Sequence, residues 1–418
     1  MHLNRTQRIM TFVIATGIGL CQTMLLAQAP TTSRAPATQR SGNAPLRVTN
    51  GGLKPPIEKE LIYVALPGTL EGSWDQNGTG IVVLDVTTNY SFVKRIPTWF
   101  VPASDWPMQV AGVTASPKTN MIYIAARGKL GAWDLTTEKM AWENAFDGSC
   151  CERPQPAPDG SFLYVGSDLK DYWYVVDPKN GDLITTVRSP QSPNAHNLNL
   201  SADGKTAFMA PNGKVMGIGD TTTHTLSKTI AFPDNVRVFV VNHDASLIYS
   251  NLNNLLGFVI ADVKTGKILH TVEVKGFGWP ENWNSPSRPR IPHGCPSHGI
   301  ALLNNEKEVW VSDGISNYIH IFDNTQMPPV QIASIKTTAG PYWLTPSIDG
   351  QRVYCSSSDV IDVKSRKIIG QLKDEYGRPM YSEKFLDMVF RNGKLTQVSN
   401  QFGNGMIMPT AQIPAPVN

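Results

Sequence analysis

Short apolar segments with an aromatic residue at or near their centre recur along this chain. The seven copies are Ile62–Val64, Ile122–Ile124, Leu163–Val165, Ala207–Met209, Ile248–Ser250, Val309–Val311 and Val353–Cys355. A second apolar segment follows each copy and ends in an aspartate, and these aspartates are Asp85, Asp134, Asp177, Asp220, Asp262, Asp323 and Asp362. Apolar runs of this length are typical of β-strands, and a repeat of this period predicts a β-propeller.

The central residues of the seven copies are about 41 to 44 residues apart, except for two intervals of about 60. Four strands and their turns fit this period. We therefore predict an all-β fold, a seven-bladed β-propeller of four-stranded antiparallel blades, closed by N- and C-terminal strands. Strands expected at 385–390 and 395–399 complete the blade that begins near Leu61. The sequence leaves open which terminus supplies which strand.

Each blade is written as strands A to D from the axis outward, and the repeated segment is strand B. Because neighbouring strands alternate in direction, the A–B and C–D turns share one face and the B–C and D–A loops share the other. The extra chain of the two long intervals lies in 66–79, 97–107 and 276–292, which are B–C or D–A loops. Long loops on one face of a rigid scaffold indicate the functional surface.

The N-terminus has the pattern of a secretory signal peptide, in which Arg5 and Arg8 precede an apolar stretch and small residues follow. A membrane anchor is the alternative, but polar residues interrupt the stretch, so no stable membrane span is expected in the mature chain. The expected domains are a signal peptide at 1–29, a Pro- and Thr-rich flexible linker at 30–58, the propeller at 59–408 and a tail at 409–418. We expect a monomeric periplasmic or secreted protein.

The formal net charge is +3, and removal of the signal peptide with its two arginines and no acids lowers it to +1. Nucleic-acid-binding proteins carry a marked excess of positive charge. This near-neutral balance therefore gives no support for a nucleic-acid partner.

The starts of the predicted A strands carry polar, charged and aromatic side chains where a purely structural blade would have proline, glycine or small apolar residues. The candidate ligand-binding residues among them are Glu152, Arg153, His196, Asn197, Arg237, His293, His298, Trp343, Glu383 and Lys384. In a propeller these starts converge on the axial funnel at the long-loop face. Convergent polar groups in a concave site predict ligand binding.

Three histidines, His196, His293 and His298, are candidate ligands of a divalent metal, together with Glu152 or Glu383. No recognised metal motif is present, and the alternative is that the imidazoles donate hydrogen bonds to loop carbonyls or to a ligand. If the protein is an enzyme, His196 or His298 would serve as the general base, with Glu383 to orient it.

Arg153, Arg237 and Lys384 give the funnel a positive component that suits a carboxylate or phosphate. The alternative is that these cations pair with Glu152 or Glu383. Aromatic residues such as Trp343 could stack on a sugar ring or anchor a long loop.

Four cysteines remain after removal of the signal peptide. In an oxidising compartment Cys150 or Cys151 could form a disulfide with Cys295, and the rival interpretations are free thiols or metal ligation. Cys355 lies within a repeated strand and is expected to be a small core residue.

The Tyr-Val segments, the Asp-Gly turns and the strand-ending aspartates resemble the YVTN family of bacterial seven-bladed propellers over residues 60–400. The resemblance implies an exported propeller, often of binding or unknown function. WD40 proteins would need repeated Gly-His and Trp-Asp pairs, and only Trp133-Asp134 is present. The segment 132–142 resembles one tryptophan-docking motif of quinoprotein propellers, but a single copy gives no support for a quinone cofactor.

Two functions follow from these patterns, and a scaffold whose outer surface binds a partner while its funnel is incidental is a third possibility. The first is a non-catalytic protein that binds a small anionic or sugar-like ligand, or a partner protein, in its axial funnel. The second is a metal-assisted, lactonase-like lyase or hydrolase that uses the rim histidines. Seven-bladed lactonases and virginiamycin B lyase show that the architecture can host such chemistry, which is an analogy of fold alone.

Overall fold

The computed structural model describes residues 58–68, 77–99, 110–147, 152–167, 169–191, 194–278, 292–303 and 305–399. The chain divides into two compact units, Met1–Lys54 and Pro55–Asn418, and every described residue belongs to the second. The predicted signal peptide, the linker up to residue 57 and the predicted tail lie outside the described residues. In the described part of the chain no helix is long and apolar enough to cross a membrane.

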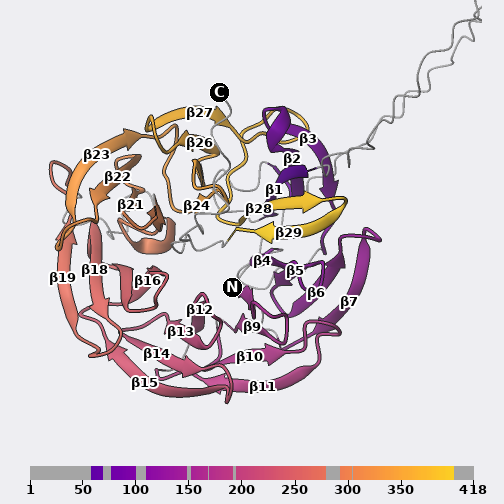
Figure 1. Cartoon of the computed structure of the whole chain (residues 1–418), viewed down its shortest axis with the longest axis horizontal. Coiled ribbons are helices and arrows are strands. Elements are labelled where there is room, and N and C mark those ends of the chain that lie inside the picture. The colour runs from indigo at the N-terminus through magenta and orange to yellow at the C-terminus, as the bar shows by residue number, and fades with distance from the viewer. Residues whose placement is uncertain are drawn as a thin grey trace, which may run out of the picture. The chain divides into compact units, whose positions relative to one another are not determined.

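Seven antiparallel sheets, numbered here as blades 1 to 7, are arranged around a central axis (Figure 1). Blade 1 contains β1 (Glu58–Pro67), β2 (Thr79–Asp85), β3 (Ser91–Ile96), β28 (Phe385–Arg391) and β29 (Lys394–Val398). Blade 2 contains β4 (Gly112–Ser116), β5 (Met121–Ala126), β6 (Lys129–Asp134) and β7 (Lys139–Ala145). Blade 3 contains β8 (Glu152–Pro156), β9 (Leu163–Gly166), β10 (Tyr172–Val176) and β11 (Leu183–Arg188).

Blade 4 contains β12 (Ala195–Leu200), β13 (Thr206–Pro211), β14 (Val215–Asp220) and β15 (Thr225–Ala231). Blade 5 contains β16 (Val236–Val241), β17 (Leu247–Leu252), β18 (Gly257–Asp262) and β19 (Ile268–Glu273). Blade 6 contains β20 (Ile300–Leu303), β21 (Glu308–Asp313), β22 (Tyr318–Asp323) and β23 (Val330–Lys336). Blade 7 contains β24 (Leu344–Pro346), β25 (Arg352–Cys355), β26 (Asp359–Asp362) and β27 (Lys367–Gln371).

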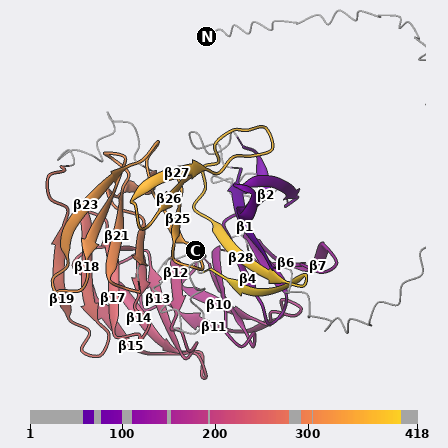
Figure 2. The ribbon, with the colours of Figure 1, turned by 45° about the horizontal axis from the view of Figure 1, so that its top comes forward.

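The predicted seven-bladed propeller is confirmed. The tilted view in Figure 2 shows the sheets side by side around the ring, with β11, β15 and β19 among the outer strands. The long stretches 66–79, 97–107 and 276–292 connect β1 to β2, β3 to β4 and β19 to β20, so they are B–C or D–A connections as predicted. Two short 3₁₀ turns, η2 (Val86–Thr88) and η3 (Pro292–Gly294), complete the elements of the described residues.

The aromatic residue at the centre of each repeated segment is buried between two neighbouring blades. The hydrophobic core of the described residues consists of seven clusters, one for each contact between neighbouring blades. The central B-strand residues fall one to a cluster, and they are Tyr63, Tyr123, Tyr164, Phe208, Tyr249, Trp310 and Tyr354. Cys355 is buried in the cluster between blades 6 and 7, as predicted. The repeat therefore supplies one large side chain for each of these contacts.

The strand-ending aspartates fix the C–D turns. In every blade the carboxylate accepts a hydrogen bond of 2.6 to 2.9 Å from a backbone N–H two or three residues further on. The donors are the backbone N–H groups of Thr87, Thr136, Lys179, Thr222, Thr265, Thr325 and Ser365. Aspartate mimics a backbone turn in this way, which explains why it recurs at this position.

The two ends of the described chain meet in blade 1. The N-terminal part supplies β1, β2 and β3, and β28 is hydrogen-bonded to β1 on the axial side, with Leu61 opposite Met388. This resolves the assignment that the sequence left open. Strand β29 adds a fifth strand to this blade, beyond β28. Leu386, Met388 and Leu395 are buried in the cluster that blade 1 shares with blade 2.

A buried carboxyl group joins the closing strand to blade 7. Asp387 of β28 is fully buried and accepts a 2.9 Å hydrogen bond from the backbone N–H of Ile348. Its carboxyl group interacts with that of Glu60, which pairs with Arg352 at 2.7 Å. Burial, and then the charge of Glu60, raise the pKa of Asp387 well above its ordinary value.

The raised pKa of Asp387 predicts a stability that falls as pH rises. A group whose pKa is raised on folding stabilises the fold fully below its unfolded-state pKa, and this contribution is lost as pH rises through the folded-state pKa. Asp387→Asn keeps the shape and the hydrogen bond from the Ile348 N–H without the charge. At pH 8 we expect the variant to be more stable than the wild type by about 1 kcal/mol or more in urea unfolding, with the difference shrinking by pH 5. An equal loss of stability at both pH values would contradict this account.

Candidate functional site

All ten predicted site residues lie at or just before the A strand of a blade, which is β28 in blade 1. Glu152 and Arg153 begin β8, His196 and Asn197 lie in β12, Arg237 lies in β16, His293 and His298 precede β20, Trp343 precedes β24, and Glu383 and Lys384 precede β28. They therefore come from six of the seven blades. Ion pairs, hydrogen bonds, ring contacts and charge interactions link these residues to one another, as the convergence of the A strands predicts.

Local irregularities of the backbone direct several of these side chains. β8, β12 and β16 each have a β-bulge near their first residues, and the bulged segments contain Arg153, His196 and Arg237. A bulge re-aims a side chain that a regular strand would point elsewhere. Arg153 and His293 also have positive φ angles of 41° and 62°, which are costly for residues other than glycine. Surrounding contacts must hold these conformations.

A chain of polar contacts connects four blades. His196 Nε2 lies 3.0 Å from Glu152 Oε2, and Arg153 Nε lies 3.2 Å from Glu152 Oε1. Arg153 Nη2 lies 3.5 Å from Glu383 Oε2, and Glu383 Oε1 lies 2.6 Å from His293 Nε2. Arg153 thus lies between two glutamate–histidine pairs. The outer members, His196 and His293, retain side-chain exposures of 16% and 24%, whereas the three inner members are almost fully buried.

Both buried glutamates are ionised. Burial raises the pKa of Glu152, but the charge of His196, its hydrogen bond and Arg153 outweigh burial and hold the pKa well below its usual range. Glu383 behaves in the same way, with His293 as the largest opposing influence. Burial, and then the charge of Arg153, lower the pKa of Lys384 to about 8, although both carboxylates oppose the shift. The site is therefore a desolvated cluster of opposite charges.

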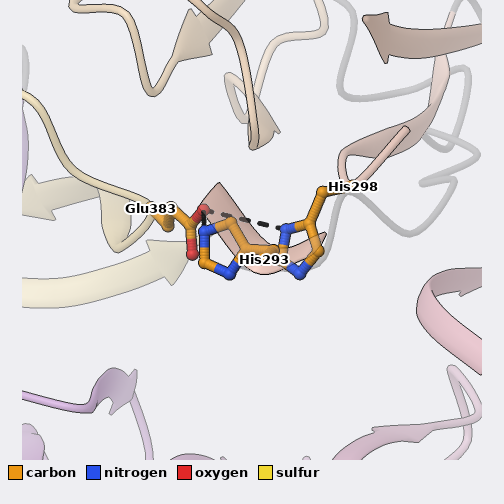
Figure 3. Close-up of side chains that lie close together, drawn as sticks. All are labelled: His293, His298 and Glu383. Atoms are coloured by element: carbon orange, nitrogen blue, oxygen red, sulfur yellow. Dashed lines mark ion pairs between the residues drawn. The ribbon is translucent and has the colours of Figure 1, made fainter. Parts of the chain in front are cut away.

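The rings of His293 and His298 are stacked with their centroids 3.9 Å apart (Figure 3). The Nδ1 atom of His298 lies 3.1 Å from the carbonyl oxygen of Tyr342 and 3.7 Å from Glu383 Oε1. Because a carbonyl oxygen only accepts, Nδ1 of His298 donates in the first contact. Burial, and then the charge of His293, lower the pKa of His298 well below its usual value, so this imidazole is neutral near pH 7.

Arg153 is held by an aromatic face as well as by carboxylates. Its guanidinium carbon lies 4.1 Å from the centroid of the Trp343 ring, which is a cation–π contact. Its Nη1 atom is buried and has no hydrogen-bond partner among the residues that the structure describes. Leaving a buried charged donor without an acceptor costs free energy.

Arg237 is a second guanidinium at the same level. It donates to the side-chain oxygen of Asn212 at 3.0 Å and to that of Asn253, and its positive charge also acts on His298. Among the residues that the structure describes, no carboxylate lies within ion-pair distance of Arg237. Asn197 donates to the Arg237 carbonyl at 3.3 Å, while its own Oδ1 atom is buried without a donor in the described structure.

Cys295 is a buried free thiol in the structure. Burial raises its pKa to about 12, so the thiol is protonated and unreactive at neutral pH. Cys150 and Cys151 lie outside the described residues. The disulfide between one of them and Cys295 therefore stays a prediction.

The structure changes two predicted groupings. His196 pairs with Glu152 and not with Glu383, because β12 lies beside β8 and the segment before β20 lies against Glu383. The three histidines accordingly do not form one metal-ligating set. Among the described residues, the group with metal-ligand spacing is His293, His298 and Glu383, whose ligand atoms lie within 4.8 Å of one another (Figure 3).

Tyr342 and Gly314 support the site in a way that sequence patterns did not reveal. The Tyr342 hydroxyl donates to the Gly314 carbonyl at 3.1 Å, and the Tyr342 ring stands where a Cβ atom on Gly314 would be, 2.2 Å from it. Tyr342 thereby holds the carbonyl group that orients His298. The aromatic Pro341-Tyr342-Trp343 start of blade 7 was a visible signal, but the need for glycine in blade 6 depends on a contact between blades.

Comparison with solved structures finds a chain of the "Crystal Structure of Mitotic Checkpoint Complex". The two superpose with a TM-score of 0.54 at 13% sequence identity, covering 77% of this chain and 95% of that chain. At this identity the likeness bears on the fold alone, and it supports the propeller architecture. No model of a protein family and no curated protein matches the sequence.

Glu152→Gln tests the buried cluster. The substitution keeps the shape but removes one of the two charges that compensate Arg153, so we expect a loss of about 3 kcal/mol in the free energy of unfolding. Glu58→Gln is the control, because Glu58 is half exposed in a 2.7 Å pair with Arg391, and such pairs contribute at most about 1 kcal/mol. Equal effects of the two substitutions in urea unfolding would show that the buried cluster makes no special contribution.

Proposed function

We propose that the protein is a non-catalytic binding protein that holds a small organic anion in its axial mouth. The observation that carries the proposal is the buried Nη1 atom of Arg153, which has no acceptor within the described structure. A guanidinium in a desolvated site binds carboxylate or phosphate strongly, because charge-assisted hydrogen bonds gain strength away from water.

The charge balance of the site supports an anionic ligand. Arg153, Arg237 and Lys384 contribute three positive charges, against Glu152 and Glu383. Both carboxylates are already engaged by histidine and by Arg153. Arg237 has only neutral amide acceptors in the described structure, so a ligand anion would neutralise it.

The ligand that fits best carries hydroxyl groups as well as an acidic group. The Oδ1 atom of Asn197 lacks a donor in the described part of the chain, and a hydroxyl group can supply one. The partly exposed rings of His196 and His293 offer further polar contacts at the edge of the buried cluster. A hydroxy acid or an acidic sugar combines these features.

Arg237→Gln tests anion binding without breaking a buried ion pair. The probes are D-glucuronate, citrate and inorganic phosphate, and affinity is measured by titration calorimetry at constant ionic strength. We expect at least one probe to bind the wild type, and the variant to bind it about tenfold or more weakly through loss of a charged hydrogen bond. Arg188→Gln, at an arginine that is 82% exposed on the outer strand of blade 3, should leave the affinity unchanged. Equal binding by all three proteins would refute the proposed site.

We also infer that the protein is exported and belongs with the YVTN-type propellers that its repeats resemble. The basic and apolar N-terminal segment supports export. Expressed from its own first residue in a Gram-negative bacterium, the chain should reach the periplasm and begin near residue 30 when sequenced. A variant that starts at residue 30 should stay in the cytoplasm. Recovery of the full-length chain from the cytoplasm, with Met1 retained, would contradict export.

The second candidate function is a metal-assisted lyase or hydrolase. The observation that favours it is the grouping of two histidines and one glutamate within metal-ligand spacing. Metal binding by this group would not by itself make the protein an enzyme.

A further inference from the structure

We propose that His293, His298 and Glu383 form a site for one divalent transition metal, and that the organic anion of the proposed function completes its coordination. The three ligand atoms lie within 4.8 Å of one another. Metal–nitrogen and metal–oxygen bonds of about 2.1 Å require ligand atoms at most about 4.2 Å apart, so small side-chain movements suffice. The part of the inference that concerns the anion rests on the proposed function, whereas the part that concerns the metal does not.

The donor set matches a known preference. Two imidazoles and one carboxylate are typical of sites for Zn²⁺ and related ions that leave coordination positions open. The three side chains come from two separate segments, the loop before β20 and the start of β28. Both segments are tied to the blades, since the Ser382 hydroxyl donates to the Ala65 carbonyl and the backbone N–H of His298 contacts Ser312 Oγ. The site is therefore built on the rigid ring.

Neighbouring groups orient the proposed ligands. The contact between His298 Nδ1 and the Tyr342 carbonyl is the kind of outer contact that fixes the ring of a metal-ligating histidine, and it leaves Nε2 of His298 as the nitrogen that would bind the metal. Arg153 contacts the second oxygen of Glu383 at 3.5 Å, which leaves Oε1 directed to the two histidines (Figure 3). The 2.6 Å contact between His293 Nε2 and Glu383 Oε1 is the contact that a bound metal ion would replace.

The surrounding cations make metal binding depend on the anion. Arg153 contacts Glu383, and the positive charges of Lys384 and Arg237 also act on the proposed ligands. These charges repel a dication, and a bound carboxylate offsets them while its oxygen fills an open coordination position. Metal and anion should accordingly strengthen each other's binding by the same factor, as linkage requires.

Cobalt(II) titration of the intact protein tests the site, because Co²⁺ reports its ligand geometry by visible absorption. With Co²⁺ alone we expect one equivalent to bind with absorption bands of a site of four or five ligands, and Zn²⁺ to displace it. His298→Ala should weaken Co²⁺ binding about tenfold or more. His243→Ala, at an exposed histidine in the β16–β17 turn, is the matched control and should bind as the wild type does. D-Glucuronate should tighten Co²⁺ binding in the wild type but not in His298→Ala.

The outcomes separate the two proposals. Absence of Co²⁺ binding in the wild type, or binding that His298→Ala leaves unchanged, would overturn the metal site even if anions bind. Metal binding without any effect of the anion would keep the three-residue site and overturn the shared coordination. If His298→Ala fails to fold, as judged by circular dichroism, His293→Ala takes its place, because His293 is more exposed and its loss leaves a smaller cavity.

Discussion

Closure of the ring by β28 is the constraint on which the rest of the structure depends. The strand pairs with β1 from Glu58 to Val64, so residues more than 300 positions apart form the innermost part of one blade. Its apolar side chains enter the cluster that blade 1 shares with blade 2, and its aspartate reaches blade 7. The segment that begins this strand also carries Glu383 and Lys384. Closure therefore fixes the fold and positions two of the charged groups of the site.

The site is a balance of buried charges held by this ring. No single pair in it is isolated, because Arg153 contacts both glutamates and each glutamate contacts a histidine. Buried charges are tolerated when partners compensate them, and here the partners come from different blades. The atoms left without partners within the described residues, on Arg153 and Asn197, lie beside this cluster. The proposed anion would therefore bind where the mutual compensation of the cluster is incomplete.

The repeat made the fold predictable from the sequence, because each aromatic residue and each strand-ending aspartate has the same local task in every blade. Tyr164 fills a contact between blades and Asp134 caps a turn, and both tasks recur at the equivalent position of every blade. The level of the site was predictable for the same reason, since A-strand starts must converge. The contacts that the residues of the site make with one another could not be predicted from the sequence. His196 pairs with Glu152 through the bulges of β8 and β12, and Gly314 is needed by a tyrosine of the next blade. Such contacts depend on distances between blades, which the sequence does not encode locally.

The bulged starts of the inner strands have a consequence for how such a protein can change over evolution. Blade packing depends on apolar side chains along the A, B and C strands, whereas the candidate site depends on one or two residues at the A-strand starts of six blades. Substituting one start exchanges a single functional group and leaves the seven aromatic contacts intact. A start outside the ion-pair chain, such as Arg237, can therefore change by a single substitution, whereas a change at Glu152 requires a compensating change in the blades that contact it.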